Sequence, residues 1–296
     1  LYPGADLSLS WPAVQGLLAL MRSWRPQIVQ AHGALSGRIA GRLAGARVVY
    51  TKHGFASAAE ASVQIREAGS LLRTLAVRHL ADRIVAVSVA VRDALIAQGA
   101  DPGRVRVIHG GVDTRSYEAA QPPVPGVVGA LGRLEREKGF DVLIAAMAEL
   151  RGEARLLIGG DGSQRAALEA QAAGLPVAFV GFVSDVPAFL SRIGILAVPS
   201  RSEGLGLVAV EGMAAGRPVV ASCTGGLSEV VAHGETGFLV EPEDPQALAG
   251  AIRRLLADPA LAARMGAAGR ARAAAQFSAD RMAAETDALY EELIAR

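Results

Sequence analysis

Cysteine is nearly absent from this sequence, because Cys223 is the only one among 296 residues. A single cysteine excludes an internal disulfide, and no group of Cys and His residues at ligand spacing offers a zinc site. We interpret Cys223 as a small apolar residue near a strand end. Aromatic residues make up only 4% of the chain, so its apolar cores must be built mainly from aliphatic side chains.

Long hydrophobic runs are also missing. No stretch of about 18 uninterrupted apolar residues occurs, which predicts no transmembrane helix. No basic segment leads into an apolar core and a cleavage site, so we expect no secretory leader. The first residue is Leu1 rather than Met, and we expect that the natural start is missing. These absences predict a cytoplasmic protein.

The formal net charge of +1 conceals an asymmetry along the chain. Residues 1–121 hold 14 Lys and Arg against 8 Asp and Glu, whereas the remainder holds 16 against 21. Two interpretations of the basic half stay open. It can contact an anionic membrane or a lipid diphosphate, or it can be a solvated Arg-rich surface. No feature predicts a nucleic-acid partner.

Short β-branched runs alternate with longer Ala-, Leu- and Arg-rich segments, which predicts strands alternating with helices. The expected strands are 27–30, 47–50, 83–87, 104–108, 127–130, 155–158, 177–180, 195–198 and 218–221. Helical spacing is found at 35–43, 71–80 and 89–98, and Ser88 is placed to cap the last of these. The pattern predicts an α/β protein with parallel sheets covered on both faces.

A proline-rich segment, Gln121–Gly126, interrupts this alternation. Three prolines in four positions suit neither a helix nor an inner strand. We therefore expect two Rossmann-like lobes that face a cleft, a front lobe over 1–121 and a rear lobe over 122–278. From about Asp244 onward the chain is expected to be helical, with breaks at Pro259 and Phe277.

Three loops in the rear half each follow a strand and precede a helix, where α/β sheets bind ligands. The first begins at Gly132 and carries Arg133 and Lys138, which could neutralise a diphosphate. The second is the glycine turn around Gly160, which resembles a degenerate phosphate loop. Taken alone, each of these two loops is more often a solvated turn than a binding site.

The third loop runs from Pro199 to the start of a helix near Gly206 and is followed by an apolar helical segment. The free N–H groups at that helix start suit a phosphate oxygen. Glu203 precedes the helix and Glu211 lies about one turn inside it. A carboxylate there can accept hydrogen bonds from ribose hydroxyls, and we favour this function over two plain surface acids.

Together these residues resemble the family-4 retaining glycosyltransferases of the GT-B fold. The resemblance is carried by Arg133 with Lys138, by Glu203 and Glu211 eight residues apart, and by the run Gly225–Glu229. The runs Val107–Asp113 and Gly234–Val240 are also similar to this family. The likeness extends from about residue 25 to 295, with the motifs in the order that the family has.

The resemblance implies roles for individual residues. Arg133 and Lys138 would hold the donor diphosphate, Glu211 the ribose, and Glu203 the donor sugar. His53 would line the sugar site. Backbone contacts to the donor are implied at Gly132, Gly160, Phe182, Val183, Gly204, Leu205, Gly206 and Leu207. His32 could have an acceptor-side role, but a capping or structural role is at least as common for such a residue.

The resemblance also implies a fold and a reaction. A last helix, 279–296, would cross back onto the front lobe, and that lobe would lack the family's first strand, which leaves a sheet edge exposed. The implied donor is a UDP-sugar first and a GDP-sugar second, and the implied acceptor is lipid-linked or glycan. No D-x-D pair occurs, which agrees with an enzyme that needs no metal or other cofactor.

Three alternatives remain from the sequence. A sugar-nucleotide epimerase of the same fold would need further acids and histidines in the cleft. A non-catalytic nucleotide-sugar binder would bind the donor without turnover. A dehydrogenase is disfavoured because the dinucleotide fingerprint is absent.

Overall fold

The computed structural model describes residues 9–55, 79–117 and 123–295. The chain divides into two compact units. The first unit comprises residues 1–109 and 283–296, and the second comprises residues 110–282. The expected helix around 71–80 and the first residues of the proline-rich linker lie outside the described residues, apart from the last two residues of that helix.

The first unit contains a parallel sheet whose described strands have the order β1-β2-β3-β4. Its elements are α1 (Trp11–Trp24), β1 (Ile28–His32), α2 (Leu35–Leu43), β2 (Arg47–Lys52), β3 (Arg83–Ala86), α4 (Val89–Ala97) and β4 (Val105–Val107). The register pairs His32 with Thr51. The carboxyl ends of β1 and β2 therefore lie side by side.

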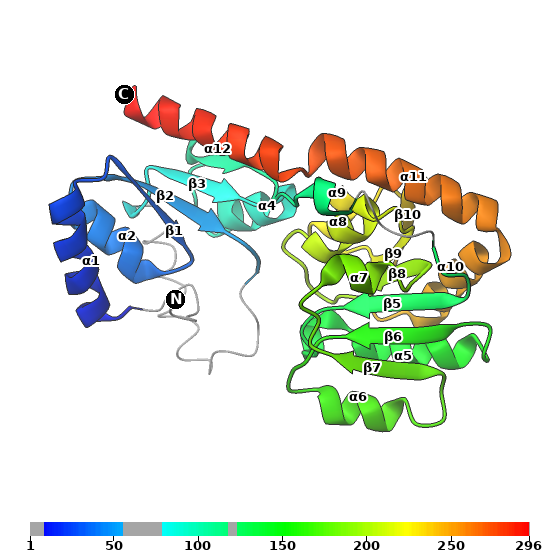
Figure 1. The fold of residues 1–296 in the computed structure, drawn as a ribbon. Helices are drawn as coiled ribbons and strands as arrows, with labels where there is room; N and C mark the ends of the chain where they lie inside the picture. The colour runs from blue at the N-terminus through cyan, green and yellow to red at the C-terminus, as the bar shows by residue number, and fades with distance from the viewer. Residues whose placement is uncertain (1–8, 56–78, 118–122, 296) are drawn as a thin grey trace. The chain divides into compact units, whose positions relative to one another are not determined.

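The second unit contains a six-stranded parallel sheet with helices on both faces (Figure 1). Its strands are β5 (Val127–Leu131), β6 (Arg155–Gly159), β7 (Val177–Gly181), β8 (Ile195–Val198), β9 (Val219–Ser222) and β10 (Gly237–Val240). Its helices are α5 (Phe140–Glu149), α6 (Arg165–Gln171), α7 (Val186–Leu190), α8 (Leu207–Ala214), α9 (Leu227–Val230), α10 (Pro245–Ala257) and α11 (Pro259–Gln276). The α/β fold with parallel sheets is confirmed.

The strand order is β10-β9-β8-β5-β6-β7. All strands are parallel, but the direction in which successive strands are added to the sheet reverses between β5 and β8. From β5 the chain steps outward to β6 and β7, then returns to β8 on the other side of β5 and continues outward to β9 and β10. Right-handed crossovers then put α5 and α6 on one face and α8 on the other. The loops after β5 and β8 diverge at this switch point, where open α/β sheets form a ligand crevice.

Helix α12 (Ala279–Ile294) contributes most of its length to the first unit. Leu289 and Leu293 are buried in a cluster with Val49, Val85 and Ile108. Near them, the Tyr290 hydroxyl is hydrogen-bonded to Gln30, and Arg83 forms an ion pair with Glu292 at 2.8 Å. The core of the first unit is thus completed by residues from the far end of the sequence.

The expected strands all form, with bounds that differ by at most two residues. Ser88 caps α4 as expected, since its Oγ accepts a hydrogen bond from the Val91 N–H at 3.1 Å. Pro259 begins α11, as its break in the pattern predicts. Helix α1 and strand β10 were not predicted. The contact division falls at His109/Gly110 rather than at 121/122, because Val112 pairs with Ser278 of the second unit.

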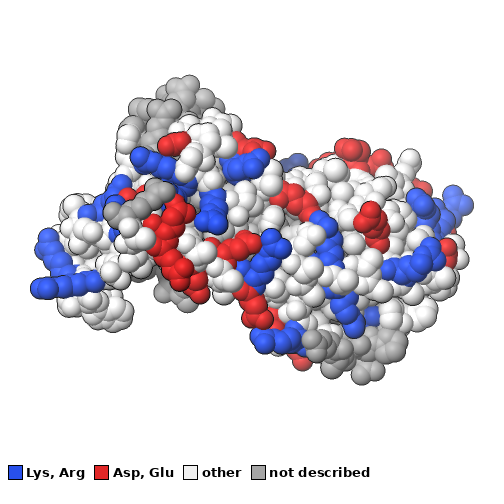
Figure 2. All heavy atoms as spheres, turned by 90° about the horizontal axis from the view of Figure 1, so that it is seen from above, with Lys and Arg blue, Asp and Glu red and all other residues white. Residues whose placement is uncertain are grey.

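Many arginines of the basic half are paired with acids. Asp82 contacts both Arg42 and Arg47, and Glu292 contacts both Arg83 and Arg106. On the face in view in Figure 2, basic and acidic side chains are interspersed rather than gathered into one basic surface. Within the described ranges, no helix is both long enough and apolar enough to span a bilayer.

Candidate active site

The loops that follow β5 and β8 are held against each other at the switch point. Gly139 has φ 66°, and a Cβ atom on it would lie 2.0 Å from the Pro199 carbonyl oxygen. The Arg201 N–H also donates to the Glu137 carbonyl at 2.8 Å. The absence of a side chain at 139 therefore lets the two loops approach closely and brings their polar residues together.

Lys138 and Glu203 form the central pair of this site. The Lys138 Nζ lies 2.9 Å from Oε1 and 2.7 Å from Oε2 of Glu203. The side chains are only 22% and 12% exposed, respectively, so the pair is shielded from much of the solvent that weakens surface ion pairs. The structure thus brings together two of the predicted site residues, which are 65 positions apart in the sequence.

Arg133 does not join this pair in the structure. Its guanidinium contacts Glu137 at 2.6 Å, and its side chain is 71% exposed. An exposed i,i+4 pair of this kind contributes little to stability. Breaking the Arg133–Glu137 pair therefore costs little free energy, so Arg133 can turn to a more strongly charged partner.

The start of α8 lies next to Glu203. Gly206 precedes the helix, whose first residue Leu207 is 46% exposed, while Leu205 is buried. The Gly226 N–H donates to the Glu203 carbonyl at 3.1 Å and fixes the backbone before the Gly204 turn. The first N–H groups of a helix have no acceptor within it, so this end can receive an anionic oxygen.

Glu211 lies within α8, one turn beyond its start, and is hydrogen-bonded to Tyr117. Tyr117 is only 5% exposed. Burial raises the pKa of Glu211, and the hydrogen bond from Tyr117 opposes this effect. Burial also raises the pKa of Tyr117, with a further contribution from the charge of Glu211. Tyr117, which comes from the segment that precedes the linker, was not predicted from the sequence.

At Gly160, the loop after β6 packs against the loop after β5. Its φ is 136°, and a Cβ atom would lie 1.8 Å from the Gly132 carbonyl oxygen. Glu135 accepts hydrogen bonds from the Ser163 N–H at 2.9 Å and from its hydroxyl at 2.6 Å. The loops after β5 and β6 are therefore tied to each other as well.

Phe182 and Val183 follow β7 on the same edge of the sheet. Phe182 is 82% exposed, which is unusual for an aromatic ring. Val183 is partly buried beside Gly159, where a Cβ atom would approach its side chain to 2.7 Å. The exposed ring of Phe182 offers a flat apolar surface.

Arg201 is a second residue that the sequence analysis did not single out. Its guanidinium binds Asp141 through two hydrogen bonds of 2.7 Å and also contacts Glu243. It donates to the Arg136 carbonyl at 2.7 Å as well. Hydrogen bonds from Arg201 lower the pKa of Asp141. Arg201 thus fixes the loop that carries Glu203. Its partners are distant in the sequence, so these contacts could not be predicted before the fold was known.

Replacing Arg201 by alanine is expected to lower the free energy of unfolding by about 1–3 kcal/mol, because charge-assisted hydrogen bonds are lost and two carboxylates face each other. Arg165→Ala is the matched control, since Arg165 forms only an exposed i,i+4 pair with Glu169, and it should cost about 0.5 kcal/mol or less. Urea unfolding monitored by circular dichroism measures both. The effect of Arg201→Ala should shrink on acidification, as Asp141 is protonated. Equal effects of the two substitutions would contradict this role.

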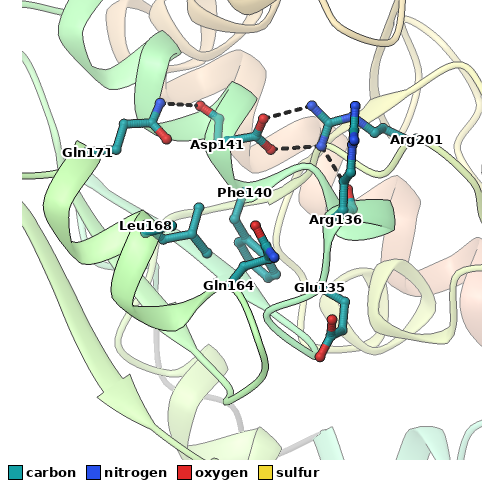
Figure 3. A pocket seen from close by; sticks show the side chains of 9 residues that line it. Glu135, Arg136, Phe140, Asp141, Gln164, Leu168, Gln171 and Arg201 are labelled. Atoms are coloured by element: carbon teal, nitrogen blue, oxygen red, sulfur yellow. Dashed lines mark hydrogen bonds and ion pairs between the residues drawn. The ribbon is translucent and has the colours of Figure 1, made fainter. Parts of the chain in front are cut away.

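A cavity of about 260 Å³ lies on the α5–α6 side of the same loops (Figure 3). It is lined by Glu135, Arg136, Phe140, Asp141, Gln164, Ala167, Leu168, Gln171 and Arg201. None of the predicted site residues lines it. Figure 3 shows Asp141 between Gln171, which donates a hydrogen bond to its backbone carbonyl, and Arg201, which donates to its carboxylate. The residues that support the loop after β8 therefore form part of the lining of this cavity.

His53 belongs to the first unit and directly follows β2. Its Nε2 lies 2.7 Å from the Nδ1 of His32, the last residue of β1. Burial, then the charges of His32 and Lys52, lower the pKa of His53. A neutral imidazole is therefore favoured at position 53. Among the described residues, no group of three or more His, Cys, Asp or Glu side chains is arranged to hold a metal ion.

Sequence comparison matches both parts of the chain to glycosyltransferase families. Residues 118–272 match the family described as glycosyl transferases group 1, and residues 1–116 match glycosyltransferase family 4. The chain is 36% identical over 294 residues to a glycogen synthase of Mycobacterium tuberculosis, covering 91% of this chain and 69% of that protein. It is 30% identical to the 2-deoxystreptamine glucosyltransferase of Streptomyces kanamyceticus, covering 98% and 84%.

Solved structures are similar over nearly the whole chain. HepE of Anabaena in complex with UDP-glucose superposes with a TM-score of 0.85 at 26% identity, covering 94% of this chain and 82% of that one. Sucrose-phosphate synthase of Thermosynechococcus elongatus superposes with a TM-score of 0.82 at 28% identity, covering 95% and 77%.

Proposed function

Because this chain belongs to the glycosyl transferases group 1 family and is a glycosyltransferase of the GT-B type, we propose that it transfers a sugar from a UDP-sugar to a hydroxyl of a lipid-linked or glycan acceptor. We further propose that the reaction retains the anomeric configuration and requires no metal ion. A GDP-sugar is the second candidate donor. The observation that carries the proposal is the shielded Lys138–Glu203 pair beside the start of α8.

In this proposal the site stabilises a leaving diphosphate. Lys138 supplies a positive charge, the N–H groups at the start of α8 supply oriented dipoles, and Arg133 can turn from Glu137 to the diphosphate. When the bond between the sugar C1 and the diphosphate oxygen breaks, negative charge develops on that oxygen. These groups lower the energy of that charge, which is the task that metal ions perform in other sites.

Glu203 and Glu211 would divide the rest of the donor between them. Glu203, already aligned by Lys138, would accept hydrogen bonds from hydroxyls of the donor sugar. Glu211 would accept hydrogen bonds from the ribose hydroxyls, and the exposed ring of Phe182 would pack against the base. The choice of uridine is supported by UDP and UDP-glucose in the structures of HepE, a relative of similar fold.

Retention follows when the acceptor attacks from the face that the diphosphate leaves. The acceptor oxygen forms its bond to C1, the bond from C1 to the diphosphate breaks, and the acceptor proton passes to the departing phosphate oxygen. His53 would contact the donor sugar during this step as a neutral imidazole. The acceptor is proposed only as a class, because the similar proteins act on chemically different acceptors.

The ribose contact is tested by Glu211→Gln with two probes, UDP and 2′-deoxy-UDP. Wild-type protein should bind UDP about 10- to 100-fold more tightly than 2′-deoxy-UDP, because a charged acceptor loses one hydroxyl partner. Glu211→Gln should weaken UDP binding and remove most of this preference. Isothermal titration calorimetry gives all four affinities. An unchanged preference in the variant would show that Glu211 does not contact the ribose.

The same residue predicts a pH dependence. Burial raises the pKa of Glu211, so its carboxylate is neutralised at a higher pH than an ordinary glutamate. UDP affinity of the wild type should therefore fall between pH 7 and pH 5 more steeply than that of Glu211→Gln. Protonation of the diphosphate itself affects both proteins alike, and the difference between the two curves isolates Glu211.

A further inference from the structure

The two histidines at the ends of β1 and β2 form a coupled pair. The Nδ1 of His32 and the Nε2 of His53 are 2.7 Å apart, and the ring centroids are 5.0 Å apart with an interplanar angle of 21°. Adjacent parallel strands hold both side chains at one edge of the sheet. Among the described residues, neither the Nδ1 of His53 nor the Nε2 of His32 makes a hydrogen bond.

One proton must lie between the two facing nitrogens. If both nitrogens carried a proton, two N–H groups would point at each other and the contact would break. If neither did, two lone pairs would repel. The contact therefore requires that one ring donates and the other accepts, so the tautomer of each ring fixes that of its partner. Lys52, buried next to His53, adds a positive charge that opposes double protonation.

Two arrangements satisfy this condition. Either His53 donates its Nε2–H to the bare Nδ1 of His32, or His32 donates its Nδ1–H to the bare Nε2 of His53. In the first arrangement both neutral rings carry their proton on Nε2, which is the intrinsically preferred tautomer of imidazole side chains. In the second arrangement both carry it on Nδ1. The first arrangement leaves the outward Nδ1 of His53 as a bare acceptor.

We propose that His32 is a positioning residue for His53: it accepts the Nε2–H of His53, fixes the plane of that ring, and leaves Nδ1 as a hydrogen-bond acceptor for a hydroxyl of the donor sugar. This inference rests on the proposed function of His53 as a sugar-site residue. It adds the residue that orients His53 and the atom through which His53 acts. A ring held in one tautomer and one plane contributes more than a freely rotating one, because misplacement by about 1 Å can cost about 100-fold in rate.

Two substitutions of His32 test whether its role is to accept the hydrogen bond from His53 or only to fill space. In His32→Asn, the side-chain amide oxygen can occupy the place of Nδ1 and accept the same hydrogen bond. In His32→Gln, the amide reaches only the place of Nε2. We expect His32→Asn to retain turnover within about threefold of wild type and His32→Gln to lose about 10- to 100-fold. Affinity for UDP should be unchanged in both, because neither substitution alters Arg133, Lys138 or Glu211, the side chains proposed to bind UDP.

Nitrogen NMR of the imidazoles provides a readout that does not depend on activity. The chain has five histidines, so comparison with His53→Ala assigns the His53 signals. We expect wild-type protein and His32→Asn to show His53 with a proton on Nε2 alone, and His32→Gln to show mixed tautomers. Turnover is followed as UDP released from UDP-glucose.

The outcomes distinguish this inference from the proposed function. A proton on Nδ1 of His53 in the wild type would overturn the proposed direction of the hydrogen bond, and an unaltered His53 spectrum in His32→Gln would show that His32 does not set the tautomer of His53. Loss of turnover in His53→Ala but full turnover in His32→Gln would overturn only the positioning role. Full turnover in His53→Ala would remove His53 from the proposed site and, with it, the role of His32.

Discussion

Replacing Lys138 by alanine is expected to weaken UDP binding by about 100- to 1000-fold, the largest loss of affinity from any single side chain of the site. Removing charge-assisted hydrogen bonds to a phosphate costs about 1.5–3 kcal/mol. A further cost arises because Glu203, only 12% exposed, would lose its partner and face the diphosphate with an uncompensated negative charge. Calorimetric titration with UDP measures the affinity directly.

The double variant Lys138→Ala/Glu203→Gln separates these two contributions. If repulsion by Glu203 is part of the loss, the second substitution should restore UDP affinity by about tenfold relative to Lys138→Ala alone. Arg165→Ala, which removes an exposed cation from the same unit, is the control for general charge. UDP affinity of Lys138→Ala within about threefold of wild type would show that the diphosphate binds elsewhere.

Gly160→Ala is expected to have the largest effect on stability, lowering the free energy of unfolding by about 3–5 kcal/mol. A φ of 136° is a backbone conformation that alanine rarely adopts, and this alone costs about 1–3 kcal/mol. The new Cβ would also lie 1.8 Å from the Gly132 carbonyl oxygen, which is backbone and cannot rotate away. The loop after β5 would have to move, so UDP affinity should fall with stability.

Gly174→Ala is the matched control for Gly160→Ala. Gly174 also has a positive φ, 81°, but no atom lies within 4 Å of a Cβ placed there. Only the conformational cost remains, about 1–2 kcal/mol. Guanidinium unfolding of the two variants should therefore differ by about 2 kcal/mol or more. Equal effects would mean that the contact between the loops after β5 and β6 does not constrain the fold.

The fold was predictable from the sequence because its elements are periodic. Buried parallel strands have β-branched runs such as those of β3 and β8, and these stand out between helices rich in Ala and Leu. Strand β10 was missed because Gly237 begins it and only three apolar residues follow. Helix α1 was not predicted, although Ser10 at its N-cap and Pro12 in its first turn are both signals of a helix start.

The candidate site was predictable only in part. Position after a strand places Lys138 and Glu203 at the correct edge of the sheet, and the structure brings them into contact. Arg133 lies close in sequence to both Glu135 and Glu137, and spacing alone does not predict that it pairs with Glu137. Tyr117 and Arg201 were not predicted as site residues because their partners, Glu211 and Asp141, are distant in the sequence. Hydrogen bonds between distant residues leave no local sequence pattern.

The packing of α12 has a consequence for the order in which the protein forms during synthesis. Residues 110–282 contain every strand and the whole core of the second unit, so they can fold as soon as they leave the ribosome. The first unit must wait, because Val49, Val85 and Ile108 stay uncovered until Leu289 and Leu293 emerge. The part of the chain that is translated first, residues 1–109, is therefore the last to acquire its native core. Until then, its apolar surface is the part of the nascent chain that a chaperone would need to protect.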